Sequence, residues 1–185
     1  MLISIHGTNG SGKSTIVREL MSQGVVDPVY GILGAIRPEA YLVKLEGVSS
    51  SVVVLGPYLV GYGGGCDHLK PFDLILRLLD KYQERGHIVM EGIITSGIIG
   101  RMGGYMKSLD GVVMRLDTPL DECIRRVEAR RQGLGVIKPL STKKLIAKYG
   151  EVERVGARFQ ALGVPVITLG QDQVLSKMMS LLRAA

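Results

Sequence analysis

The chain has 185 residues, of which 46% are hydrophobic, and this length and composition suit one buried core and argue against intrinsic disorder. Two cysteines, Cys66 and Cys123, are too few for a disulfide framework, and three scattered histidines argue against a structural zinc site. The net charge of +6 favours a polyanionic partner, and no apolar run reaches the roughly 18 residues of a membrane span. We therefore expect a cytoplasmic protein with reduced thiols.

The first predicted element is a strand over Leu2–His6, whose apolar residues indicate burial on both faces. The sequence GTNGSGKS follows directly and matches the pattern G-x-x-x-x-G-K-[ST] in full. A helix over Thr15–Met21 is expected to begin inside this loop. A strand, a glycine loop and a helix in this order predict a phosphate-binding loop of the P-loop NTPase and kinase superfamily, which the chain resembles here.

The glycines of such a loop let successive backbone N–H groups turn toward one anion, and the N-terminus of the following helix points at the same anion. Lys13 can reach the outer phosphates of ATP, and the hydroxyl of Ser14 can ligate Mg²⁺. The residues expected to bind the nucleotide are Gly7, Asn9, Gly10, Ser11, Gly12, Lys13, Ser14 and Thr15.

In the middle of the chain, Tyr41–Glu46 and Ser51–Leu55 are rich in strand-forming residues, and the short break between them predicts a hairpin. A helix is expected over Pro71–Arg85, because Pro71 suits its first turn and Gly86 can end it. An apolar strand over Ile88–Met90 then runs into Glu91.

Predicted strands and helices also alternate in the last part of the chain. A strand over Val112–Leu116 precedes a helix that Thr118 is expected to cap, with Pro119 at its first position. A later helix, a strand over Val164–Leu169 and a helix over Gln173–Leu182 complete the chain. Alternating strands and helices predict a single three-layer α/β domain over residues 1–185, with a parallel sheet of about five strands and helices on both faces.

A small kinase also needs an acid that orients the acceptor hydroxyl. Glu91 lies at the carboxyl end of a strand, where doubly wound sheets bind ligands, and it can accept a proton or hold Mg²⁺. Asp67 follows three glycines that allow a close approach to a ligand. We favour Asp67 as the base and Glu91 as the residue nearer the metal, and the sequence leaves both assignments open. Asp117, a third acid at a strand end, is interpreted as local structure.

A kinase further needs cations that stabilise the charge on the transferred phosphoryl group. Arg126 and Arg130 are four residues apart and so share one face of the predicted helix, within a group that includes Arg125 and Arg131. This group and the glycines after it resemble the helix and lid of small kinases. We expect a lid at about residues 125–140 and an acceptor-binding insert at about residues 30–70.

Three further segments narrow the family: VVLGPY at residues 53–58, GGGCDHLKPFD at 63–73, and HIVMEGIITS at 87–96 with Gly100 and Arg101 after it. They resemble bacteriophage P-loop kinases that phosphorylate 5-hydroxymethyluracil in DNA, a step towards hypermodified thymine. The resemblance implies acceptor-site roles for Asp67, Lys70, Glu91, Ser96 and Arg101. One departure is Pro57, which stands where the pattern has an arginine.

The resemblance and the residues together predict an ATP- and Mg²⁺-dependent phosphotransferase whose acceptor is a modified pyrimidine in DNA. Tyr58 could stack on an extrahelical base, although a structural role for its ring is equally compatible with the sequence. Two rival functions remain at this stage: a kinase of a free nucleotide or small metabolite, and a nucleic-acid-stimulated ATPase. Both ATP and GTP are compatible with the phosphate-binding motif as the donor.

Overall fold

The computed structural model describes residues 1–31, 36–58, 64–69, 71–92 and 99–185. Within these residues the strands form one sheet of seven, in the order β2-β3-β4-β5-β1-β6-β7. The strands are β1 (Leu2–His6), β2 (Gly24–Val29), β3 (Ala40–Leu45), β4 (Val52–Leu55), β5 (His87–Glu91), β6 (Val112–Leu116) and β7 (Val166–Leu169).

The strands β4, β5, β1, β6 and β7 are parallel. Beyond β4 the sheet continues with β3, which is antiparallel to β4, and with β2, which is antiparallel to β3. The α/β class and the hairpin of β3 with β4 are confirmed, and the sheet is mostly parallel, but it has seven strands where about five were expected. The difference is β2, which the sequence does not predict. It pairs on one side only and contains Asp27 and Pro28, two residues that strands usually exclude but that an edge strand tolerates.

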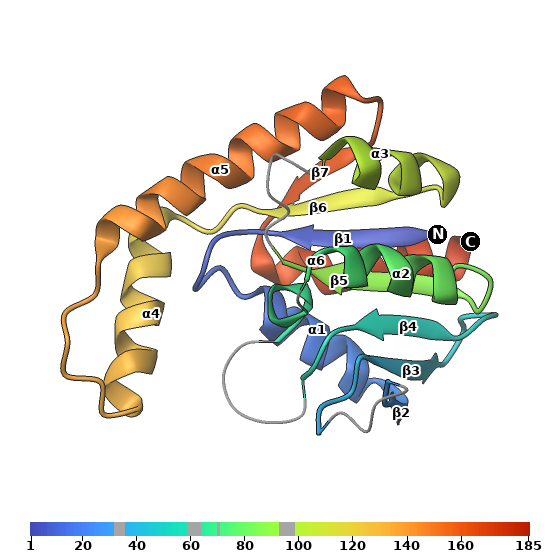
Figure 1. Ribbon diagram of the computed structural model, residues 1–185, viewed down its shortest axis with the longest axis horizontal. Coiled ribbons are helices and arrows are strands. Elements are labelled where there is room, and N and C mark those ends of the chain that lie inside the picture. The colour runs from blue at the N-terminus through green and yellow to red at the C-terminus, as the bar shows by residue number, and fades with distance from the viewer. Residues whose placement is uncertain (32–35, 59–63, 70, 93–98) are drawn as a thin grey trace.

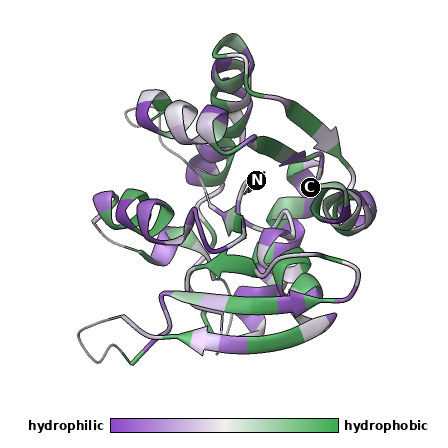
Figure 2. Cartoon of the chain, turned by 90° about the vertical axis from the view of Figure 1, so that its right-hand side faces the viewer, coloured by the Kyte–Doolittle hydropathy of each residue, from purple (hydrophilic) through white to green (hydrophobic). Residues whose placement is uncertain are grey.

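Helices cover both faces of the sheet (Figure 1). One face packs against α2 (Asp73–Tyr82), α3 (Ile99–Ser108) and α5 (Thr142–Ala161), and the other against α1 (Lys13–Ser22) and α6 (Gln171–Ala184). Neighbouring residues of β1 alternate between the two cores, with Leu2 in the first and Ile3 in the second. All five residues of β1 are buried, as predicted, because both faces of this central strand are covered. Hydrophobic residues accordingly predominate along the strands (Figure 2).

The remaining helix, α4 (Leu120–Gly133), packs on α5 through a small apolar cluster that contains Cys123, Val127 and Leu145. The helix α4 and the first half of α5 extend beyond the carboxyl ends of the strands (Figure 1). Their connection is residues 134–141, and the chain therefore carries a helical projection next to the glycine loop after β1.

The start of α4 differs from the prediction. Pro119 occupies the cap position itself, and the expected capping role of Thr118 is wrong. The Thr118 hydroxyl instead donates a hydrogen bond to the carbonyl oxygen of Ser11 at 3.0 Å. This buried contact joins the end of β6 to the glycine loop after β1, so the two neighbouring strand ends are held together.

Both cysteines are buried free thiols, as predicted. No helix in the described residues is long and apolar enough to cross a membrane.

Candidate active site

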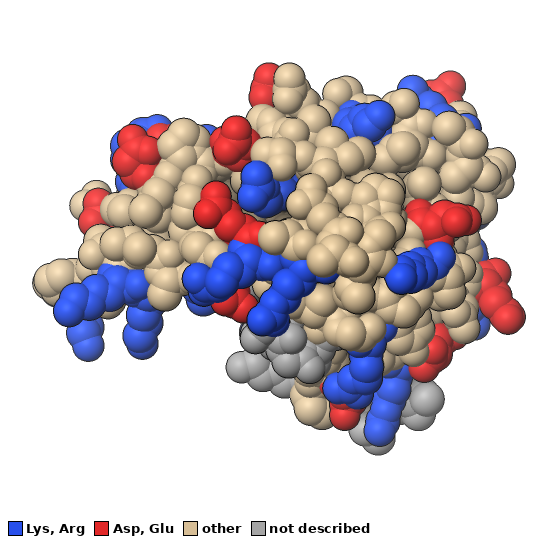
Figure 3. Space-filling model, turned by 90° about the horizontal axis from the view of Figure 1, so that it is seen from above, with Lys and Arg blue, Asp and Glu red and all other residues tan. Residues whose placement is uncertain are grey.

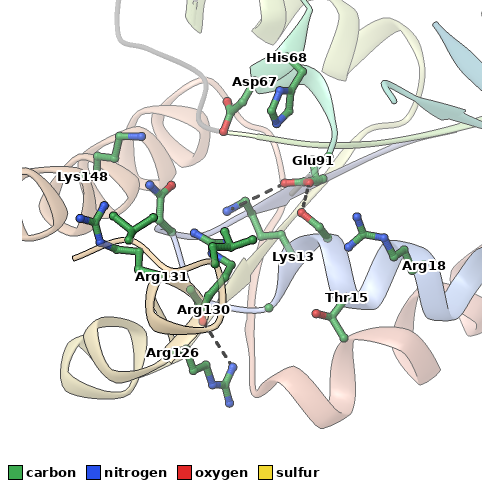
Figure 4. Close-up of a pocket in the computed structure, with 17 residues that line it drawn as sticks. Lys13, Thr15, Arg18, Asp67, His68, Glu91, Arg126, Arg130, Arg131 and Lys148 are labelled. Carbon is green, nitrogen blue, oxygen red and sulfur yellow. Dashed lines mark hydrogen bonds and ion pairs between the residues drawn. The ribbon is translucent and has the colours of Figure 1, made fainter. Parts of the chain in front are cut away.

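A cavity of about 660 Å³ lies at the carboxyl ends of the central strands. Five parts of the chain line it: the loop and first turns after β1, the segment around the short 3₁₀ helix η1 (Cys66–His68), the end of β5, the helices α4 and α5, and the connection between these two helices. Figure 4 shows these side chains facing one another across the cavity, with Glu91 near its centre. The predicted site residues that line it are Asn9, Gly10, Gly12, Lys13, Ser14, Thr15, Asp67, Glu91, Arg126 and Arg130.

The loop between β1 and α1 turns sharply into the helix at Gly12. Gly12 precedes α1 with a φ of 100°, and the N–H groups of Thr15 and Ile16 donate to its carbonyl oxygen at 3.0 and 3.1 Å. A Cβ atom on Gly12 would lie 2.6 Å from the side chain of Gln171. Only glycine combines this backbone conformation with so close a neighbour. The first residues of α1, Lys13, Ser14 and Thr15, line the cavity. Gly7 and Ser11 belong to the loop but do not line the cavity.

Lys13 and Glu91 form a buried pair beneath this loop. The Lys13 ammonium donates to the carbonyl oxygens of Gly7 and Thr8 at 2.9 and 3.1 Å, and it lies 4.0 Å from the Glu91 carboxylate. The side chains of Lys13 and Glu91 are only 8% and 2% exposed. Burial raises the pKa of Glu91 and lowers that of Lys13, and the attraction between the two opposite charges opposes both shifts.

The other oxygen of Glu91 accepts a hydrogen bond from the Ser14 hydroxyl at 2.5 Å. Ser14 is the last residue of the phosphate-binding motif, and Glu91 ends the strand that pairs with β1. A hydroxyl and a carboxylate oxygen beside a phosphate cradle are the hard oxygen donors that suit Mg²⁺, which usually takes one or two protein ligands and completes its shell with phosphates and water.

Asp67 is brought beside Glu91 by the close packing of two loops. Gly65, with a φ of 77° and a ψ of −166°, sits so near Glu91 that a Cβ atom would lie 2.7 Å from its Cγ, Cδ and carbonyl oxygen. Gly92 follows Glu91, and a Cβ atom added to Gly92 would lie 3.0 Å from Oδ1 of Asp67. The segment GGCD therefore packs directly on the EG that ends β5, and Asp67 and Glu91 share one wall of the cavity (Figure 4).

The arginines of α4 take different positions. Arg130 and Arg131 line the cavity, and Arg125 forms an exposed ion pair with Glu122 at 2.6 Å without lining it. Arg126 also lines the cavity, but its guanidinium points away from Glu91 (Figure 4). Its Nε donates to Glu122 and its Nη1 to the Gln171 amide oxygen, both at 2.6 Å, and Nη1 lies 3.5 Å from the carbonyl oxygen of Gly10. Arg126 therefore ties α4 to the glycine loop and to the start of α6.

Two further residues predicted to bind the acceptor, Tyr58 and Arg101, lie outside the cavity. Tyr58 is 6% exposed and packs against the Tyr41 ring, with ring centroids 6.1 Å apart, and does not line this cavity. Arg101 begins the exposed face of α3 and pairs with Asp73 at 3.0 Å, also outside the cavity. Lys70 and Ser96 lie outside the described residues.

Three cavity residues escape the sequence prediction: Arg18, His68 and Lys148. Arg18 could have been found, because it follows Ser14 by four residues and so shares its face of α1. His68 directly follows Asp67 in η1. Lys148 has no local signal, because only the packing of α5 on α4 brings it to the cavity.

Comparison with known proteins decides the family. No protein-family model matches the chain. A 5-hmdU DNA kinase of Pseudomonas phage PaMx11 is 30% identical over 187 residues, which cover 99% of this chain and 97% of the relative. The chain belongs to the 5-hmdU DNA kinase family. A 5-hmdU DNA kinase of Pseudomonas phage M6 is 26% identical over 89% of this chain and 88% of the relative. A 5-hmdU DNA kinase 1 of Salmonella phage ViI is 29% identical over 77% of this chain and 65% of the relative.

Proposed function

We propose that the chain is an ATP-dependent kinase that transfers the γ-phosphate to the hydroxymethyl group of 5-hydroxymethyluracil in DNA. The activity named for its relatives supports the reaction and the acceptor. The observation that carries the proposal is a cavity in which Lys13, Ser14 and glycines of the phosphate-binding motif face Asp67 and Glu91. The same phage relatives lead us to expect that the enzyme acts in the cytoplasm of an infected bacterium.

The donor half of the site would consist of the glycine loop, Lys13 and Ser14. Backbone N–H groups at the start of α1 would bind the β-phosphate, and Lys13 would exchange its contacts with backbone carbonyls for the β- and γ-phosphate oxygens. Ser14 and Glu91 would hold Mg²⁺, directly through the hydroxyl and through water from the carboxylate. The ion would neutralise charge on the phosphate oxygens and orient them for in-line transfer.

The acceptor half would be organised by Asp67. Its carboxylate would accept a hydrogen bond from the hydroxymethyl O–H and take the proton as the oxygen attacks the γ-phosphorus. The new bond joins that oxygen to phosphorus, the bond from the γ-phosphorus to the bridging oxygen breaks, and ADP leaves with the electron pair. Glu91 suits this base role less well, because Ser14 occupies one of its oxygens and Lys13 lies beside the other.

The arginines of α4 would serve two purposes. Arg130 and Arg131 line the cavity from the side opposite Asp67, where guanidinium groups can stabilise the charge that develops on the phosphoryl oxygens. Arg126 would act mainly by positioning, because Glu122 and Gln171 occupy its donors. Closure of this side over the nucleotide would exclude water and so limit hydrolysis of ATP.

The test offers the enzyme ATP labelled in the γ-phosphate together with DNA that contains 5-hydroxymethyluracil, with the same DNA containing thymine, or with the free modified nucleotide. We expect label on the modified DNA alone. Label on the mononucleotide alone, or free phosphate released on plain DNA, would contradict the proposal and favour one of the two rivals.

The base assignment is tested by Asp67→Asn, which should lower kcat by about 10²- to 10⁴-fold because the proton acceptor is lost. The matched control is Asp73→Asn, since Asp73 is an exposed acid of α2 whose side chain does not line the cavity. Equal rates for the two variants would remove Asp67 from the mechanism.

A further inference from the structure

The net charge of the chain is concentrated in one segment. Residues 130–148, which we call the α4–α5 arm, contain six basic residues and no acidic one. The rest of the chain holds 17 basic residues, which are the 23 of the whole chain less these six, and it holds all 17 acidic residues. The net charge of +6 therefore equals the charge of the arm, and the rest of the molecule is neutral.

Only part of this charge faces the nucleotide cavity. Arg130, Arg131 and Lys148 line it, whereas Lys138, Lys143 and Lys144 are exposed and do not. None of these three lysine ammonium groups has an ion pair within the part of the chain that the structure describes. Figure 3 shows Lys and Arg side chains along one margin of the end of the molecule where the arm lies. The arm thus carries cations beyond those that an ATP phosphate could use.

The arm also exposes apolar side chains. Of the seven large hydrophobic residues that are exposed in the described chain, four belong to it: Leu134 at 57%, Val136 at 40%, Ile137 at 97% and Ile146 at 51%. Backbone bonds order the tip, since the N–H groups of Gly135 and Val136 donate to the carbonyl oxygens of Gln132 and Arg131 at 2.9 and 3.0 Å. Arg131 also donates to the carbonyl oxygen of Lys138. The Ile137 side chain is therefore exposed to solvent on a turn that these hydrogen bonds order.

An apolar tip flanked by unpaired cations fits duplex DNA. A hydroxymethyl group on a stacked base cannot reach a carboxylate inside a cavity, so the base must leave the stack. DNA-bending proteins commonly insert Ile, Leu or Pro between base steps while their cations bind the phosphates on either side. The tip of the arm has this composition, with Ile137 and Pro139 on either side of Lys138.

We propose that the α4–α5 arm docks on the DNA acceptor, with Lys138, Lys143 and Lys144 on backbone phosphates and Ile137 filling the gap in the base stack that the extrahelical base leaves. This inference rests on the proposed function, because it takes modified DNA as the acceptor. It adds a recognition element that lies outside the nucleotide cavity. Because Leu134 and Val136 line that cavity while Ile137 points to solvent, the arm can contact the base stack and the reacting centre at the same time.

The first test uses Ile137→Ser, which should fold normally because the side chain is 97% exposed. We expect kcat/KM on a duplex with one 5-hydroxymethyluracil to fall about tenfold or more, and kcat/KM on the matching single strand to change less than about threefold, because only the duplex needs a base displaced. A 2-aminopurine beside the modified base should brighten with the wild type and not with the variant. Val25→Ser, an exposed apolar change on β2, is the matched control.

The second test uses the double variant Lys143→Gln and Lys144→Gln. We expect the slope of log K against log salt for duplex binding to become less steep by about 2, one for each lost phosphate contact. The control removes the same charge elsewhere, with Lys107→Gln on α3 and Lys177→Gln on α6.

The outcomes separate the two proposals. Equal losses of Ile137→Ser on single-stranded and duplex DNA, or a salt slope that changes no more than in the control, would overturn the role of the arm. Failure of the wild type to label any DNA would instead contradict the proposed function, and the salt slope and the 2-aminopurine signal would still report on the arm.

Discussion

Replacing Gly65 by alanine should separate Asp67 and Glu91, the two acids of the candidate active site. The new Cβ atom would lie 2.7 Å from the Glu91 side chain and from its carbonyl oxygen, and the backbone at Gly65 lies in a region that is almost exclusive to glycine. The backbone conformation should cost about 1–3 kcal/mol. Displacing the overlapping atoms should cost about another 1–3 kcal/mol. We therefore expect a loss of about 4 kcal/mol in the free energy of unfolding.

The chain contains a suitable control for this experiment. Gly163 has the same φ of 77°, and a Cβ atom there would meet nothing within 4 Å. Gly163→Ala should therefore cost only about 1–2 kcal/mol, from the positive φ alone. The excess loss in Gly65→Ala then contains the packing of the loop on Glu91 together with any additional cost of the Gly65 backbone conformation.

Urea denaturation followed by circular dichroism gives both free energies of unfolding. The labelled-ATP assay on modified DNA gives the rates, and a displacement of about 1 Å in Asp67 should lower kcat about 10²-fold. Equal stability losses in the two variants, together with an unchanged rate for Gly65→Ala, would refute the view that this contact places Asp67 beside Glu91.

Three further predictions concern single side chains. Glu91→Gln should raise the Mg²⁺ concentration needed for half-maximal rate, and an unchanged Mg²⁺ dependence would remove it from the metal site. Arg130→Ala should lower kcat about 10³-fold. The kcat of Arg125→Ala, on the same helix but outside the cavity, should stay within about threefold of the wild-type value. Similar kcat values for the two variants would show that Arg130 has no role at the phosphoryl group. Burial, together with the nearby charge of Lys13, lowers the pKa of His6 from 6.5 to about 3. The folded state therefore favours neutral His6, and the resulting stability is complete above pH 6.5 and is lost as the pH falls below that value. Between pH 7 and pH 5 the wild type should lose about 2 kcal/mol more than His6→Asn in urea denaturation, and parallel pH curves would show that His6 does not titrate in this way.

The parts of the fold that local sequence determines were predicted well. The phosphate-binding loop follows a strand and opens a helix, because its glycines permit the turn and its lysine and serine begin α1. The hairpin of β3 and β4 and the strand that ends in Glu91 follow from short apolar runs bounded by turn residues. Glu91 lies beside the glycine loop, because the carboxyl ends of the parallel strands β5 and β1 share one edge of the sheet.

The parts that depend on tertiary contacts were not predicted. The sequence does not predict α3, because Gly100, Gly103 and Gly104 lower its helical propensity. The helix forms because Ile99 and Met102 are buried against the core. Spacing placed Arg126 and Arg130 on one face of α4, but it could not tell that Gln171, from the far end of the chain, would bind the guanidinium of Arg126.

The confinement of the charge to the α4–α5 arm has a consequence for how the protein would approach DNA. A neutral body with a basic end behaves as an electric dipole, so the field of a polyanion exerts a torque on it before contact. Encounters would begin with the arm and its adjacent cavity toward the duplex, and the far side of the molecule would gain little from non-specific adhesion. Such an enzyme could bind DNA rapidly in a productive orientation. It could also dissociate from each modified base after the reaction, because the rest of its surface would bind DNA only weakly.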